Sequence, residues 1–285
     1  RGLVGSEMCI RDRCYSTLVL DPKYDNLPGV EYEQYGPHRF AQGVVSLLPT
    51  ILTDLKAYRK KAKKLMAQHE GTPLEAIYNG QQLAYKISMN SIYGFTGASK
   101  GMLPCVAIAS TVTMRGRQMI EETKNYVEAN FPGAKVRYGD TDSVMVEFDV
   151  QGRRGQEAID YSWQQGELAA EQCTKLFKAP NDLELEKVYC PYFLYSKKRY
   201  AAKMYERKGD AVVFKKIDVK GLQVVRRDSC QFVRETLKRL LEMVLESSDP
   251  MPVVEAARSA ARELLNGQVP MEKLMMSKQL AAEYK

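Results

Sequence analysis

The chain has few of the side chains that build metal and nucleophile sites in many enzymes. Its 285 residues include two histidines and six cysteines, and no two cysteines form a C-x-x-C pair. A zinc site with its usual ligand spacing is therefore excluded. A Ser-His-Asp or Cys-His centre is not expected either, because His38 and His69 lie in predicted loop or helix-end contexts. The scattered cysteines favour reduced thiols in the cytosol or nucleus over a secreted disulfide framework.

Long hydrophobic runs are also missing. The apolar stretch from Val44 to Leu52 is interrupted, whereas a membrane span needs about 20 consecutive apolar residues. The first residues are charged and lack an apolar core, so we expect no signal peptide. Hydrophobic residues make up 45% of the chain and charged residues 27%. This composition is ordinary for a globular protein and argues against bulk disorder.

Positive charge is in moderate excess. Lys and Arg number 42 against 35 Asp and Glu, which gives a net charge of +7. Such an excess suits a polyanionic partner, but many domains with other functions reach it. Placement of the charges therefore matters more than their sum.

Hydrophobic spacing and turn residues predict helices that alternate with strand hairpins. Residues 14–46 are rich in turn residues and are expected to form a loop with one or two short strands. Helices are predicted at about 48–69, 74–93, 106–130 and 157–178, and from 229 to the end with breaks at 249–252 and 266–267. Strands are predicted within 135–148, 183–205 and 214–219.

Two carboxylates spaced i, i+2, Asp140 and Asp142, lie in the predicted turn of one strand hairpin. Nothing basic is adjacent in sequence, so the pair needs either solvent or a bound cation, and hard oxygen ligands suit Mg²⁺. The competing interpretation is a solvated turn, because D-x-D is common in loops. Taken alone, the acidic pair favours the solvated turn.

Two further clusters are basic. Arg59 and Lys63 are spaced i, i+4 on one predicted helix, and Lys86 lies on the next helix, so the three would suit a triphosphate if they converge. Lys198 is the middle one of three cations in a predicted turn flanked by tyrosines, and three such cations would suit a phosphodiester backbone. The competing interpretations are a solvated basic helix face and an ordinary charged turn.

Together these motifs resemble family B DNA polymerases, and finer features resemble the eukaryotic delta members of that family. The motifs that carry the resemblance follow the family's order and spacing: Lys86-x-x-x-Asn90-Ser91-x-Tyr93-Gly94, Tyr138-Gly139-Asp140-Thr141-Asp142-Ser143, Lys197-Lys198-Arg199-Tyr200, Lys220-Gly221-Leu222 and Arg226-Arg227-Asp228. The delta-like features are Gly94-Phe95-Thr96-Gly97-Ala98, Leu103-Pro104-Cys105 and Leu183-Glu184-Leu185-Glu186-Lys187-Val188-Tyr189.

The resemblance implies an α+β fold with a palm, helical-hairpin fingers and part of a helical thumb. The palm would comprise residues 14–47 and 95–228, the fingers 48–94 and the start of the thumb 229–285. The palm is expected to contain an antiparallel sheet with the Asp140–Asp142 hairpin at its centre.

The resemblance also implies an activity, which is template-directed transfer of dNMP from a dNTP to a primer 3′-OH. Two Mg²⁺ ions would be held by Asp140 and Asp142, with Glu184 and Glu186 as secondary candidates. The incoming nucleotide would be bound by Arg59, Lys63, Lys86, Asn90 and Tyr93. The primer–template DNA would be contacted by Lys197, Lys198, Arg199, Tyr200, Lys220 and Gly221. The implied setting of the parent protein is the nucleus, with accessory polymerase subunits and a sliding clamp and without a membrane.

The first 13 residues depart from the family pattern. The family has an acidic D-x-x-S-L-Y-P-S motif shortly before the equivalent of Cys14, and this sequence has no Asp-x-x-Ser-Leu-Tyr there. Residues 1–13 are interpreted as a non-native tract, and Asp12 is not assigned a role. With one metal-binding motif missing, the polypeptide as written is expected to be inactive. The alternatives are a nucleic-acid-binding fragment and a viral or other family B polymerase.

Overall fold

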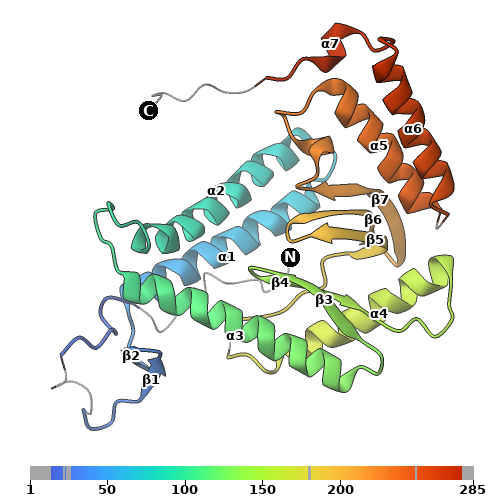
Figure 1. The fold of residues 1–285 in the computed structure, drawn as a ribbon. Coiled ribbons are helices and arrows are strands. Elements are labelled where there is room, and N and C mark those ends of the chain that lie inside the picture. Colours follow the sequence, from blue (N-terminus) through green and yellow to red (C-terminus); the bar gives the residue numbers. More distant parts are fainter. Residues whose placement is uncertain (1–13, 22, 24–26, 179–180, 248, 278–285) are drawn as a thin grey trace. The chain divides into compact units, whose positions relative to one another are not determined.

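The computed structural model describes residues 14–277 apart from 22, 24–26, 179–180 and 248 (Figure 1). The chain divides into two compact units. The first unit comprises Arg1–Glu147 and Leu168–Glu184, and the second comprises Phe148–Glu167 and Leu185–Lys285. No helix in the described part is both long and apolar enough to span a membrane.

The first unit begins with a small hairpin and a pair of long helices. Strands β1 (Tyr32–Tyr35) and β2 (His38–Ala41) pair antiparallel. Helices α1 (Leu47–Gln68) and α2 (Pro73–Thr96) run side by side as a helical hairpin (Figure 1). Gly71 takes a left-handed φ of +79° and Pro73 is the first helical residue of α2, so the turn ends one helix and starts the next.

The next elements of this unit are a third helix and a second strand hairpin, and the segment Leu168–Glu184 also belongs to it. Helix α3 (Val106–Asn130) packs against strands β3 (Lys135–Asp140) and β4 (Ser143–Glu147), which pair antiparallel. The core draws residues from the start of the unit, from all three helices and from the segment after α4: Cys14, Tyr35, Phe40, Leu48, Leu52, Met89, Ile108, Val112, Met119 and Phe177. The hairpin of β1 and β2 and the helical hairpin therefore share one continuous apolar core with α3.

The second unit is built on a three-stranded antiparallel sheet. Its strands β5 (Val188–Ser196), β6 (Arg199–Lys208) and β7 (Ala211–Lys220) lie in chain order, so β6 is central. Helix α4 (Gly155–Thr174) places Ile159 and Trp163 against Val212. The remaining elements are η3 (Gln223–Val225), α5 (Gln231–Glu246), α6 (Met251–Leu265) and α7 (Met271–Leu274).

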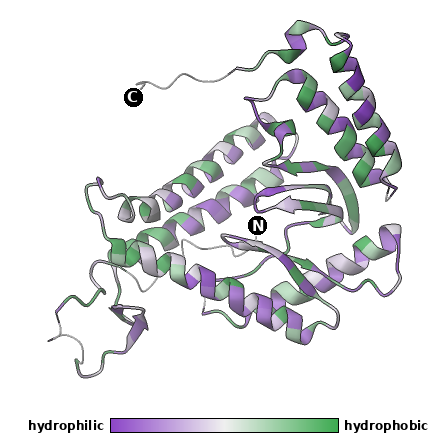
Figure 2. Ribbon diagram, in the orientation of Figure 1, coloured by the Kyte–Doolittle hydropathy of each residue, from purple (hydrophilic) through white to green (hydrophobic). Residues whose placement is uncertain are grey.

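The helices carry hydrophobic and hydrophilic residues side by side along their length, as expected of helices that bury one stripe (Figure 2). The mixed α+β class is confirmed, and α3 has the predicted bounds. The helices at the C-terminal end break at the two predicted positions, although residues 275–277 are not helical.

Two details differ from the predictions. Strand β5 starts at Val188 rather than Leu183, because the Leu183 N–H donates to Thr174 Oγ1 at 2.8 Å instead of joining a ladder. In the described residues β3 and β4 pair only with each other, whereas the hairpin was expected at the centre of a palm sheet. A central position needs a partner strand on the outer side of the hairpin, and β5–β7 form a separate sheet.

Candidate functional site

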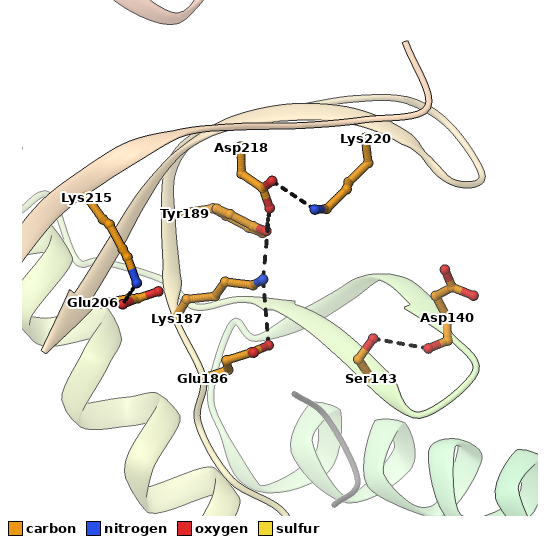
Figure 3. A network of polar contacts seen from close by, with 9 residues as sticks. All are labelled: Asp140, Ser143, Glu186, Lys187, Tyr189, Glu206, Lys215, Asp218 and Lys220. Atoms are coloured by element: carbon orange, nitrogen blue, oxygen red, sulfur yellow. Dashed lines mark hydrogen bonds and ion pairs between the residues drawn. The ribbon is translucent and has the colours of Figure 1, made fainter. Parts of the chain in front are cut away.

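The acidic turn, residues 140–143, is braced by its own hydrogen bonds. Asp140 pairs with Ser143, and Thr141 takes a left-handed φ of 56°. The Asp142 N–H donates to the Asp140 carbonyl at 2.6 Å, and Ser143 Oγ donates to the same carbonyl at 3.1 Å (Figure 3). Thr141 Oγ1 donates to Asp140 Oδ1 at 3.0 Å. These bonds fix the backbone that carries both carboxylates.

The strands behind this turn are supported by α3. A Cβ on Gly139 would meet Ile120 Cγ2 at 3.5 Å, which shows how closely the hairpin approaches the helix. Glu128 on α3 also accepts a hydrogen bond from the Val136 N–H at 3.0 Å. The acidic turn is therefore the tip of a hairpin whose base is anchored to a long helix.

The donor set of the acidic turn fits Mg²⁺ in its chemistry. Asp140 and Asp142 are half-buried, and carboxylate oxygens are the hard ligands that this ion prefers. Within the described residues, no group of three or more His, Cys, Asp or Glu side chains is gathered for a metal ion. Glu184 and Glu186 are exposed, and their predicted secondary role stays a prediction. A magnesium role for these two aspartates stays a prediction, and the pair alone would supply only part of a coordination shell.

The predicted nucleotide-binding residues lie on the two helices of the hairpin formed by α1 and α2. The rings of Tyr58 and Tyr85 are 5.9 Å apart, so the helices meet at the level of their neighbours Arg59 and Lys86. Arg59 is only 9% exposed, which differs from a solvated basic face, whereas Lys86 is half-buried.

The remaining members of this set are described less fully. Lys63 and Asn90 are exposed, one turn further along α1 and α2 than Arg59 and Lys86. Tyr93 lies within α2, but its side chain is outside the described part of the structure. The placement of these residues on two packed helices is compatible with a shared ligand, and their roles stay predictions.

The basic turn, residues 196–199, joins β5 to β6. Ser196 pairs with Arg199, and Lys198 takes a left-handed φ of 62°. Lys197, Lys198 and Arg199 are exposed, whereas Tyr200 is buried. Three of the predicted DNA-binding residues are therefore cations at the surface, whereas Tyr200 packs in the interior.

Gly221 fixes this turn from the end of the neighbouring strand. Its φ is +64°, and a Cβ at this position would lie 2.2 Å from the Lys198 carbonyl oxygen. No side chain fits such a space, so the backbone after β7 packs directly against the backbone of the turn. The predicted pair Lys220-Gly221 is thus brought next to Lys198.

A buried carboxylate, which the sequence did not single out, lies beside this region. Asp218 is 5% exposed and accepts a hydrogen bond from Tyr189 Oη at 2.7 Å (Figure 3). Lys220 Nζ is 3.1 Å from Asp218 Oδ1, and Lys187 Nζ is 3.9 Å from Oδ2. Lys187 in turn lies 3.6 Å from Glu186. The one sequence signal for this network is that Asp218 and Lys220 are two apart on a strand and so share a face.

The pKa values of Asp218, Tyr189 and Lys187 reflect both their burial and their polar contacts. Burial alone would raise the pKa of Asp218, but the Tyr189 hydrogen bond and the Lys220 ammonium outweigh it and leave the pKa below its usual range. Burial, reinforced by the hydrogen bond to Asp218, raises the pKa of Tyr189. Burial lowers the pKa of Lys187, although Asp218 opposes the shift. Asp218 is therefore a charged acceptor and Tyr189 a neutral donor at neutral pH.

Known proteins are similar in sequence to this chain over nearly its whole length. Residues 6–285 match DNA polymerase family B, a range that starts inside the segment interpreted as non-native. A DNA polymerase of Paramecium bursaria Chlorella virus NY2A is 45% identical over 94% of this chain and 30% of its own length. The DNA polymerase delta catalytic subunit of Caenorhabditis elegans is 41% identical over 98% of this chain and 26% of its own length.

The corresponding subunit of Candida albicans is 38% identical over 97% of this chain and 27% of its own length. The chain therefore spans about a quarter to a third of the length of these relatives. The family match covers far more than half of the chain and includes all of the motifs quoted above. The chain belongs to DNA polymerase family B.

Proposed function

We propose that this chain supplies part of the palm, the fingers and the start of the thumb of a replicative DNA-directed DNA polymerase. The reaction is attack of a primer 3′-OH on the α-phosphate of a dNTP, with release of pyrophosphate. The observation that carries the proposal is the acidic turn, in which Asp140 and Asp142 are fixed by local hydrogen bonds at the tip of a supported hairpin.

In this function Asp140 and Asp142 would hold Mg²⁺. Bound metal would stabilise the attacking and leaving oxygens of the displacement. The contribution of the chain is to keep the two carboxylates close together on a rigid turn, so that little reorganisation is needed when the charges of the nucleotide arrive. The missing share of the coordination shell would come from another acidic motif of the parent protein.

The hairpin of α1 and α2 would bind the triphosphate. Lys63, on the exposed part of α1, and the half-buried Lys86 offer ammonium groups, and Arg59 offers a guanidinium at the level of Lys86. Asn90 would support this site, and Tyr93 would pack beneath the nascent base pair. The basic turn with Lys220 would bind the primer–template backbone without reading its sequence.

The expected partners of the parent protein are primer–template DNA, a dNTP, accessory polymerase subunits and a sliding clamp. A eukaryotic delta-type enzyme in the nucleus is supported by the two delta relatives. A viral polymerase is the second candidate, and the 45% identity to the chlorovirus enzyme favours it. The genomic sequence that encodes the residues upstream of Cys14 would distinguish these sources.

Primer extension by the complete gene product tests the proposed function. With Mg²⁺ and a primer–template, we expect incorporation of the dNTP complementary to the template base. The 285-residue polypeptide alone is expected to bind the duplex without extending it, because its sequence holds no Asp-x-x-Ser-Leu-Tyr motif before Cys14. A complete product that binds DNA but incorporates nothing would instead favour a non-catalytic nucleic-acid-binding role.

A further inference from the structure

The three-stranded sheet carries a buried carboxylate close to a group of exposed cations. Asp218 is buried, whereas Lys220 on the same strand face and the cations of the basic turn are exposed. A buried carboxylate is costly unless it is hydrogen-bonded and paired. Its presence here therefore calls for a role beyond filling space.

The register of the strands explains how the tyrosines of β5 come close to the carboxylate of Asp218. Tyr192 on β5 and Asp218 on β7 both pair with Ala202 on the central strand, so the three residues form one row. Ala202 is fully buried and has a small side chain, which leaves room above it for aromatic rings. The rings of Tyr189 and Tyr192 stack there at 5.6 Å, and the Tyr189 hydroxyl reaches Asp218.

Tyr189, Tyr192 and Tyr200 form a tyrosine cluster that extends to the basic turn. Tyr200, the first residue after Arg199, lies 6.0 Å from Tyr189 and 5.5 Å from Tyr192 between ring centroids. Tyr200 also pairs with Lys220 across the ladder. The side chains that contact Asp218 are thus packed against the first strand residues behind the turn.

A second connection runs through the backbone. Asp218 Oδ1 lies 3.1 Å from Lys220 Nζ, and the residue after Lys220, Gly221, packs its backbone against the Lys198 carbonyl. One carboxylate is therefore linked to the basic turn twice, once through the tyrosine cluster and once through the end of β7.

We propose that Asp218 is a positioning residue for DNA binding, which holds Lys220 and the basic turn in the arrangement that contacts the phosphate backbone. The inference rests on the proposed function, because it assumes that these cations bind duplex DNA. Cations that are already held in place lose less conformational entropy when they bind phosphates. Asp218 therefore raises affinity although its own charge repels DNA.

This mechanism makes a prediction opposite in sign to that of simple electrostatics. If Asp218 acted only through its charge, Asp218→Asn would remove one negative charge and release Lys220, so binding would tighten. If Asp218 positions the cations, the same substitution weakens binding. The direction of the change therefore separates the two explanations.

The experiment measures the affinity of the full 285-residue chain for a primer–template duplex by fluorescence anisotropy across a range of salt concentrations. The variants are Asp218→Asn and Tyr189→Phe, which removes only the hydroxyl that holds Asp218. The matched control is Asp210→Asn, which makes the same charge change at an exposed position in the turn between β6 and β7. Circular dichroism and thermal melting report whether each variant is folded.

We expect Asp218→Asn to bind about five- to tenfold more weakly, with a salt slope reduced by about one. Tyr189→Phe should lose a smaller factor in the same direction, and Asp210→Asn should bind as tightly as the unchanged chain or slightly more tightly. If Asp218→Asn does not fold, Tyr189→Phe decides: a weaker, less salt-dependent complex supports the inference, and an unchanged one overturns it.

Two other results would separate the positioning role of Asp218 from DNA binding by the basic turn. Binding of Asp218→Asn that matches or exceeds that of Asp210→Asn, with the unchanged chain binding DNA normally, would overturn the positioning role alone. Failure of the unchanged chain to bind any duplex would overturn the proposed function of the basic turn and the inference with it.

Discussion

The acidic turn and the basic turn are both two-residue turns, but they have opposite charge and place their left-handed residue at different positions, first in the acidic turn and second in the basic turn. Each joins two antiparallel strands through two residues, between Asp140 and Ser143 in one and between Ser196 and Arg199 in the other. Each also places a residue other than glycine in the left-handed region, with φ of 56° at Thr141 and 62° at Lys198.

The two turns differ in what stabilises them. A left-handed residue other than glycine costs about 1–3 kcal/mol and persists only when its surroundings require it. In the acidic turn the surroundings are local, since Asp142, Ser143 and Thr141 all bond to Asp140. In the basic turn they are remote, since the backbone at Gly221, directly after β7, packs against the Lys198 carbonyl. Substitutions should therefore act locally in the first turn and at a distance in the second.

The largest expected effect is that of Asp142→Asn in the complete gene product. Loss of one carboxylate charge would weaken the metal binding proposed for the acidic turn, so nucleotide incorporation should fall by about 10²–10³-fold or more. Because the local hydrogen bonds of the turn come from backbone and hydroxyl groups, primer–template affinity should stay nearly unchanged. Single-nucleotide incorporation and anisotropy measure the two quantities.

The control for this substitution is Asp149→Asn, which changes the same charge at an exposed position after β4. It should leave incorporation close to that of the unchanged protein. Equal losses of incorporation and DNA affinity in Asp142→Asn would show that Asp142 has a structural role, and the contrast between the two turns would then disappear.

The next largest effect is that of Gly221→Ala, which tests the remote support of the basic turn. The added Cβ would lie 2.2 Å from the Lys198 carbonyl oxygen, so backbone must move, and destabilisation of about 3 kcal/mol is expected. Gly209→Ala is the matched control, because Gly209 has the same φ of +64° but nothing within 4 Å of its Cβ position. It should cost about 1 kcal/mol, measured by chemical unfolding.

Duplex affinity should follow the same order, with Gly221→Ala clearly weaker than Gly209→Ala. Equal unfolding free energies and equal affinities for the two variants would indicate that the approach of Gly221 to Lys198 is not needed for the basic turn.

Acid unfolding gives a smaller effect, which concerns Asp218. Its pKa is held below the usual range of about 3.9 because Tyr189 and Lys220 outweigh burial, so the unfolded chain takes up a proton at a higher pH than the folded chain does. The stabilisation from Asp218 is therefore present above about pH 4 and is lost as the pH falls through the folded-state pKa.

Asp218→Asn should accordingly be less stable at pH 7 by about 1–2 kcal/mol, and its difference from the unchanged chain should shrink below pH 4. Chemical unfolding at several pH values measures this difference, with Asp210→Asn as the control for an exposed carboxylate. A difference that stays constant down to pH 2 would contradict the lowered pKa of Asp218.

The two turns also show which features the sequence could predict. The hairpin of β3 and β4, the helical hairpin and the bounds of α3 follow from hydrophobic spacing and turn residues, which are local signals. The acidic turn was predicted for the same reason, because both carboxylates and the residues that brace them lie within four positions.

The support of the basic turn was not predictable in this way. Tyr189 and Asp218 are 29 positions apart and meet only because β5 and β7 both pair with the central strand β6, where Tyr189 lies opposite Met204 and Asp218 lies opposite Ala202. The burial of Arg59 likewise depends on how α1 packs, which its i, i+4 spacing with Lys63 does not report. The separation of the hairpin of β3 and β4 from the three-stranded sheet is also a question of long-range pairing.

The smallest expected effect is that of Lys198→Ala, which removes one cation of the basic turn. Since phosphate contacts carry no sequence information, affinity should fall by about two- to fivefold for every duplex tested, and the salt slope should be reduced by about one. Lys208→Ala, which removes an exposed lysine beside the turn between β6 and β7, is the control and should change neither quantity.

A loss confined to certain DNA sequences would mean that Lys198 reads base edges, and an equal loss in Lys208→Ala would mean that the basic turn acts only through net charge. The positioning of Lys198 by Gly221 and Asp218 predicts neither result, because a cation fixed at one place contributes one localised phosphate contact.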